Sequence, residues 1–163
     1  MNKIDWDSYF MTMVYLVASR SKDKSTHIGA VIVGPDKEIR ATGYNSFPRG
    51  IIDWKDERQE RPEKYYWFAH AELNAISNAA LVGVSLKDCT LFTNGIPCAT
   101  CGRAVINAGI REVVVDSRWQ FYQKDKWEEE SKRTLEMFKE ADISLRYWLG
   151  EFVEIKRWSQ QWL

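Results

Sequence analysis

The sequence has few of the residues that build covalent or membrane-embedded scaffolds. It contains three cysteines among 163 residues, an odd and small number that makes a poor disulfide framework. No N-terminal apolar run resembles a signal peptide, because Asp5 and Asp7 interrupt the start. No stretch is long and apolar enough to span a bilayer. We therefore expect no membrane partner and a cytoplasmic location, where free thiols persist.

An excess of charge of one sign is also lacking. The 23 Lys and Arg residues balance the 23 Asp and Glu residues, so the formal net charge is zero. A protein that grips a nucleic-acid backbone usually carries a basic surplus. The balance argues against a nucleic-acid strand as the main ligand, whereas a small anionic ligand needs only a few well-placed donors.

The composition that is present fits one folded unit. Hydrophobic residues make up 45% of the chain and charged residues 28%, so we expect residues 1–163 to form a single domain. Eight tryptophans indicate large apolar contacts in the core or between subunits. The extension 149–163 is rich in aromatic residues and packs either on the same domain or, as the alternative, on another subunit. Residues near this extension are spaced as on one helix face: Trp148, Phe152, Ile155 and Trp158.

Hydrophobic periodicity predicts helices and strands that alternate along the chain. Two β-branched runs around a Gly-Pro-Asp turn predict an antiparallel hairpin, and the alternation in the second half indicates parallel strands with crossovers. Prolines and charges in residues 45–67 predict a long irregular excursion. A mixed sheet covered on both faces follows. The expected strands are 27–33, 38–44, 89–93, 112–115 and 143–148, and the expected helices are 5–20, 70–81, 98–108 and 126–141.

Three residues in two clusters have the chemistry of zinc ligands. They are His70 and the pair Cys98 and Cys101, which follows a proline at the start of a predicted helix. A structural zinc ion requires four protein ligands, and only His27 and Cys89 remain as further histidine and cysteine. Three ligands with one open position are typical of a catalytic ion, so the sequence predicts one catalytic Zn²⁺.

Glu72 is the candidate acid–base group, because it follows His70 by two positions and can share the site without binding the metal. A lone glutamate at such a position is more often a solvated helix residue, and a lone Cys-x-x-Cys can belong to a redox or structural site. His-x-Glu followed by Pro-Cys-x-x-Cys is, however, a combination known from zinc nucleobase deaminases. The combination therefore favours hydrolytic deamination over a purely structural zinc module.

With these motifs the chain resembles the cytidine and deoxycytidylate deaminase superfamily, and the deoxycytidylate branch fits best. The resemblance runs from about residue 6 to residue 148. The metal motifs are specific to the superfamily, and the Gly-Tyr-Asn and Pro-Arg-Gly stretches point to the branch. The segments that carry it are 21–23, 27–33, 43–50, 70–76, 97–101 and 108–110.

The resemblance implies a three-layer α/β/α fold with a five-stranded mixed sheet. It implies that a free cytosine nucleotide is the substrate, with dCMP hydrolysed to dUMP and ammonia in support of thymidylate synthesis. It also implies a homo-oligomer, either a hexamer or a dimer. A regulatory nucleotide bound with Mg²⁺ is a further expectation, although Ser46 stands where the family commonly has glycine, in a region linked to that regulation.

The resemblance also suggests which residues meet the nucleotide. Asn45 is expected to contact it, and the main chain of Ala30 is expected to lie against the pyrimidine. The phosphate is expected near the loop before the hairpin, where the sequence does not choose among four residues. Two aromatic residues after the fourth strand are candidates for a pocket wall, with ordinary packing as the alternative. The full set is Arg20, Lys22, Ser25, His27, Ala30, Asn45, Ala71, Trp119 and Phe121.

Several alternatives share the metal motif. A tRNA adenosine deaminase needs a basic surface for its RNA, which the zero net charge disfavours. Deaminases of cytidine, dCTP or 5-methyl-dCMP differ from a dCMP deaminase only in the substrate. From a different class, a catalytically silent nucleotide-binding subunit is conceivable, but the intact Glu72 argues against it.

Overall fold

One five-stranded sheet organises the protein, which we describe from a computed structural model over residues 4–121 and 128–154. The strand order is β2-β1-β3-β4-β5. β1 pairs antiparallel with β2 and β3, whereas β3, β4 and β5 run parallel. The expected hairpin and mixed sheet are thereby confirmed. The strands are β1 (Gly29–Val33), β2 (Ile39–Tyr44), β3 (Thr90–Thr93), β4 (Glu112–Asp116) and β5 (Ser144–Trp148).

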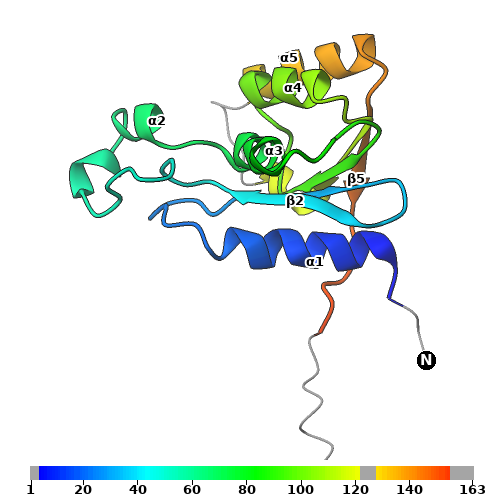
Figure 1. Cartoon of the computed structure of the whole chain (residues 1–163), viewed down its shortest axis with the longest axis horizontal. Coiled ribbons are helices and arrows are strands. Elements are labelled where there is room, and N and C mark those ends of the chain that lie inside the picture. The colour runs from blue at the N-terminus through cyan, green and yellow to red at the C-terminus, as the bar shows by residue number, and fades with distance from the viewer. Residues whose placement is uncertain (1–3, 122–127, 155–163) are drawn as a thin grey trace, which may run out of the picture.

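Helices cover both faces of the sheet, as Figure 1 shows, and give the expected three layers. α1 (Trp6–Ala18) lies on one face, and α3 (Ala71–Val82) and α4 (Ala99–Asn107) lie on the other. α5 (Glu128–Glu140) packs beside α4. Successive residues of β1 enter different cores, with Val31 packed on the α1 side and Ile32 on the α3 side, as the alternation of a strand requires.

Two glycines let the helical layers approach the hairpin closely. A Cβ at Gly29 would lie 2.1 Å from the carbonyl oxygen of Val14 in α1. A Cβ at Gly43 would lie 2.3 Å from the amide nitrogen of Ala75 and 2.4 Å from the carbonyl oxygen of Ala71 in α3. Since real Cβ atoms essentially never come within 3.0 Å of such atoms, only glycine fits at either position.

The structure differs from the sequence expectations mainly at the ends of elements. β1 begins at Gly29, so His27 and Ile28 belong to the preceding loop. The excursion between β2 and α3 contains the short helices η1 (Asp56–Arg58) and α2 (Lys64–Trp67). The sequence did not predict them, because the charged composition of this segment shows no hydrophobic periodicity. Searched over its described residues, the protein has no helix with the length and apolar character of a membrane span.

The aromatic extension continues past β5 without forming a helix over residues 149–154. The ring of Phe152 packs on Tyr15 of α1, with centroids 4.8 Å apart, and on Trp148, with centroids 5.4 Å apart. Phe152 therefore packs on its own domain. Ile155 and Trp158 lie outside the described residues.

Candidate active site

The strand directions bring the two metal-ligand clusters to one end of the sheet. β2 and β3 both run antiparallel to β1, so they point the same way. The chain leaves β2 into the excursion and returns through a bridge between Ser46 and Ala69, immediately before His70. Cys98 follows β3 directly. His70 and Cys98 are the N-cap residues of α3 and α4, and both have extended backbone. Their side chains are in contact, so the two helices begin close to each other.

His70, Cys98 and Cys101 come together there. The Nδ1 atom of His70 lies 3.4 Å from each sulfur, and the three ligand atoms lie within 4.8 Å of one another. A tetrahedral zinc ion with Zn–N near 2.0–2.1 Å and Zn–S near 2.3 Å has N···S edges of about 3.6 Å. The donor set and its spacing therefore fit zinc. Of the residues that the structure describes, no other group of three His, Cys, Asp or Glu is so arranged.

The two thiols of this cluster share a proton unequally. Hydrogen bonding from Cys101, assisted by His70, lowers the pKa of Cys98 to about 4 although burial opposes it. The same bond with Cys98, together with burial, raises the pKa of Cys101. The hydrogen bond to Cys98 also raises the pKa of His70, against the effect of burial. Thiolates are the form of cysteine that binds zinc, and the lowered pKa of Cys98 favours that form.

Glu72 lies in the first turn of α3, with 6% of its surface exposed. Burial raises the pKa of its carboxyl, and the nearby His70 imidazole acts in the opposite direction. A carboxyl whose pKa is moved toward neutrality can both accept and return a proton at physiological pH. Glu72 therefore lies close enough to His70 to interact with it electrostatically, and its acid–base role stays a prediction.

Glu130 is a neighbour of the site that sequence reasoning missed. The amide of Ala99 donates a hydrogen bond of 2.9 Å to its Oε2 atom, so a side chain of α5 caps the beginning of α4. No local motif could have revealed this contact, because the acceptor comes 31 residues after the donor.

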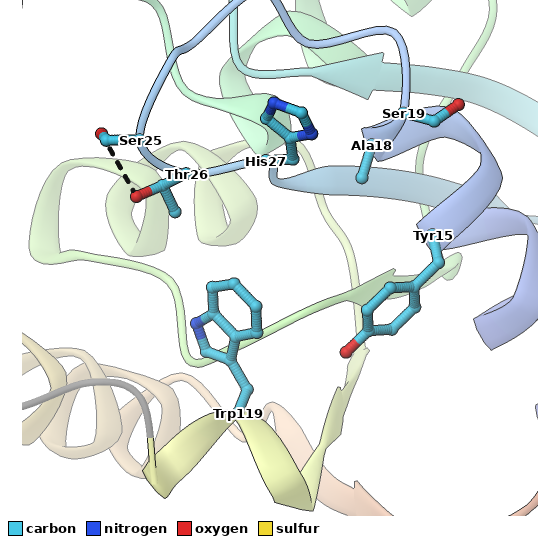
Figure 2. Close-up of a pocket in the computed structure, with 7 residues that line it drawn as sticks. All are labelled: Tyr15, Ala18, Ser19, Ser25, Thr26, His27 and Trp119. Carbon is cyan, nitrogen blue, oxygen red and sulfur yellow. Dashed lines mark hydrogen bonds between the residues drawn. The ribbon is translucent and has the colours of Figure 1, made fainter.

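A cleft of about 560 Å³ opens at the same end of the sheet. Figure 2 shows the ring of Trp119 rising from η2 (Ser117–Phe121) toward the loop that carries Thr26 and His27. The loop precedes β1 and Trp119 follows β4. The strand β3 lies between these two strands, and its Thr93 pairs with Ala30 of β1 and with Val115 of β4. Three predicted residues, Ser25, His27 and Trp119, therefore meet at one cleft. The lining is Tyr15, Ala18, Ser19, Ser25, Thr26, His27 and Trp119.

The remaining predicted residues are placed elsewhere. Arg20 and Lys22 are exposed and do not belong to the cleft lining, and Lys22 pairs with Asp53 of the excursion. Ala30 and Ala71 lie in one buried core cluster between the sheet and α3. The side chain of Phe121 lies outside the described part of the structure.

Asn45 is buried, and its amide serves the loop that lines the cleft. Its Oδ1 accepts from the amide of Ile28 at 2.8 Å, and its Nδ2 donates to Asp23 at 3.0 Å and to the carbonyl of Thr26 at 2.9 Å. Both amide hydrogens of Asn45 are therefore committed within the protein. Direct contact of Asn45 with a nucleotide stays a prediction.

A buried polar group supports the other side of the cleft. The hydroxyl of Tyr15 donates to Oδ2 of Asp116 at 2.8 Å, and Nε of Arg118 donates to Oδ1 at 2.9 Å. Burial, reinforced by the Asp116 carboxylate, raises the pKa of Tyr15 to about 12. The guanidinium of Arg118 also lies against the rings of Trp148 and Phe152. Sequence reasoning missed this group because its members come from three separate elements.

Comparison with known proteins agrees with this geometry. Residues 4–117 match the family model of the cytidine and deoxycytidylate deaminase zinc-binding region. Mouse deoxycytidylate deaminase is 33% identical over 93% of this chain and 84% of its own length. The yeast deoxycytidylate deaminase is 36% identical over 86% of this chain and 44% of its own length. The dCMP deaminase of cyanophage S-TIM5, solved with dCMP and dUMP, has a TM-score of 0.70 at 20% identity, covering 91% of this chain and all of that one.

The match covers more than half of the chain, and mouse deoxycytidylate deaminase is related over most of both sequences. The protein therefore belongs to the cytidine and deoxycytidylate deaminase family, whose zinc-binding region it contains. The structural likeness supports the three-layer fold. The expected fold class and the expected family are both confirmed.

Proposed function

We propose that this protein is a deoxycytidylate deaminase, which hydrolyses the C4 amino group of dCMP. The reaction consumes one water and gives dUMP and ammonia. The observation that carries the proposal is the cluster of His70, Cys98 and Cys101 with the buried carboxyl of Glu72 beside it. Relatives named deoxycytidylate deaminase in mouse and human, each covering 93% of the chain, support dCMP as the substrate.

His70, Cys98 and Cys101 would hold one Zn²⁺ and leave its fourth position open. The ion, when bound, lowers the pKa of its water from about 15.7 to about 7 and so supplies the nucleophile. Glu72 takes the proton of that water and delivers it to N3 of the cytosine ring. Once the oxygen has bonded to C4, Glu72 would take the second proton, from the new C4 hydroxyl, and pass it to the amino group, so that C4=O forms, the C4–N bond breaks and ammonia leaves. Glu72 is therefore the acid–base residue of the proposed mechanism.

The cleft is the proposed seat of the rest of the nucleotide. The hydroxyl of Thr26 and the ring of His27 are polar groups that can face a phosphate, whereas the hydroxyl of Ser25 already donates to Asp23. The indole of Trp119 offers an apolar wall for the sugar or the base. In this proposal Ala30 and Ala71 belong to the core between the sheet and α3 and do not line the cleft, and the placement of Asn45 behind the loop suits a role in holding it.

The decisive experiment replaces Glu72 by glutamine. Because general acid–base groups contribute about 10²–10⁴-fold, Glu72→Gln should lower kcat for dCMP by that factor. Zinc content should stay at that of the unmutated protein, since Glu72 is not one of the three clustered ligands. The exposed Glu140→Gln is the matched control and should keep full activity. Undiminished turnover in Glu72→Gln would refute the proposed role.

A substrate panel tests the nucleotide. We expect the purified protein to release ammonia from dCMP faster than from dCTP, CMP, deoxycytidine or 5-methyl-dCMP. A preference for a tRNA anticodon stem would instead indicate an adenosine deaminase, and no turnover of any substrate would indicate a silent binding subunit. Homo-oligomer formation, regulation by a nucleotide with Mg²⁺ and a cytoplasmic location stay predictions.

A further inference from the structure

A buried carboxylate organises the loop that lines the cleft. Oδ1 of Asp23 accepts from the amide and the hydroxyl of Ser25 at 2.8 and 2.9 Å and from the amide of Thr26 at 3.2 Å. The backbone oxygen of Asp23 lies 2.9 Å from Nε2 of His27. Three successive cleft residues are thus fixed by one aspartate, of which 3% is exposed.

Lys64 of α2 supplies the only cation that the described ion pairs place on this carboxylate. Its Nζ lies 2.6 Å from each of the two carboxylate oxygens of Asp23 and donates at 2.6 Å to the hydroxyl of Ser25. The lysine side chain is 9% exposed, and its ammonium also lies 5.5 Å from the ring centre of Phe68. Lysine is rarely buried to this degree unless it is paired.

The pair therefore joins the excursion to the cleft. Burial alone would raise the pKa of Asp23, but the hydrogen bonds from Lys64 and Ser25 outweigh it and lower the pKa, so the carboxylate stays charged. The same two segments are also linked by the exposed pair of Lys24 and Asp56, whose side chains are 63% and 82% exposed. Only the first link is shielded from water, and an exposed pair contributes little.

We propose that Lys64 is a positioning residue, which holds Asp23 and thereby keeps Ser25, Thr26 and His27 in the arrangement that receives the phosphate end of the substrate. This inference rests on the proposed function. Lys64 lies behind the loop and pairs with Asp23, so its effect passes through the loop. It sets how well a nucleotide is held and leaves the proton transfers of Glu72 unchanged.

The test compares dCMP with deoxycytidine, which lacks the phosphate. In Lys64→Met the loop loses its charged anchor, and KM for dCMP should rise about tenfold, the equivalent of one hydrogen bond to a charged group. The value of kcat and the zinc content should not change, and kcat/KM for deoxycytidine should keep its original value. A general loss of structure would reduce both substrates alike.

Two further variants keep the result interpretable. Lys24→Met removes one exposed pair between the same segments, leaves that of Lys22 with Asp53, and should leave every constant unchanged. The double variant Asp23→Asn with Lys64→Met leaves no unpaired buried charge, so it should be more stable than Lys64→Met alone. It should show the same selective rise in KM for dCMP.

An unchanged KM for dCMP in a folded Lys64 variant, or an equal loss with both substrates, overturns the positioning role and leaves the proposed function standing. If the unmutated protein does not deaminate dCMP at all, the proposed function itself fails and the role of Lys64 fails with it.

Discussion

Gly43→Ala tests whether the proposed catalytic residues depend on the close approach of β2 and α3. The added Cβ would lie 2.4 Å from the carbonyl oxygen of Ala71 and 2.3 Å from the amide nitrogen of Ala75, whereas ordinary contact begins at 3.4 Å. The backbone of α3 must therefore retreat by about 1 Å. Forced overpacking of this kind costs about 1–3 kcal/mol of stability, and backbone atoms cannot turn aside as a side chain can.

The displacement of α3 in this variant matters for chemistry because Ala71 lies between His70 and Glu72. A misplacement of about 1 Å can cost about 10²-fold in rate, so kcat/KM for dCMP should fall by that order. Urea unfolding measures the stability change, and steady-state kinetics with zinc analysis measures the effect on the site.

Gly83→Ala is the matched control for this prediction. Gly83 ends α3 with φ of 74°, and a Cβ there meets nothing within 4 Å. Its cost of about 1–2 kcal/mol is conformational, and activity should be retained. If Gly43→Ala loses no more stability than Gly83→Ala and keeps the original kcat/KM, the close approach does not position the site.

Two further perturbations test the metal cluster and the buried tyrosine. Cys101→Ala removes a predicted ligand and should weaken zinc binding by more than the roughly 10–100-fold that loss of an outer partner causes, as measured by competition with a chromophoric chelator. Cys89→Ala, outside the cluster, should bind zinc normally; equal affinity in both variants would exclude Cys101 as a ligand. Tyr15 has its pKa raised to about 12, above the usual value of about 10, so its contribution to stability is complete below pH 10 and is lost as the pH rises toward 12. Unfolding measured across this range should show that loss in the unmutated protein and a smaller one in Tyr15→Phe, and identical pH profiles would contradict a half-buried Tyr15 that keeps its proton.

The metal cluster could be predicted from the sequence because its chemistry is local. Two cysteines three residues apart at a helix start, and a histidine two residues before a glutamate, each define half of the site. Their convergence requires only that α3 and α4 begin at the same end of the sheet, which the alternation of strands and helices makes natural. Glycine at positions 29 and 43, by contrast, showed no pattern that revealed how closely the layers pack.

The cleft was harder to predict because its residues depend on long-range pairing. Of the nine residues that the sequence suggested for nucleotide contact, three line the cleft: Ser25, His27 and Trp119. Lys22 instead pairs with Asp53 of the excursion. Lys64 gave no signal at all, since a lysine in a charged stretch ordinarily faces water. Its burial follows from Asp23, 41 positions earlier, and no spacing rule connects residues so far apart.

The bridge between Ser46 and Ala69 holds the two ends of the excursion together. The chain departs at the end of β2 and comes back to the same place before the imidazole ligand, whatever path it takes between. Within the excursion, Trp54 is 75% exposed. New sequence, such as a peptide tag or a small inserted module, can therefore be accommodated beside Trp54 without altering the separation of imidazole and thiols, provided that the segment around Lys64 and the pair of Asp53 with Lys22 are left intact.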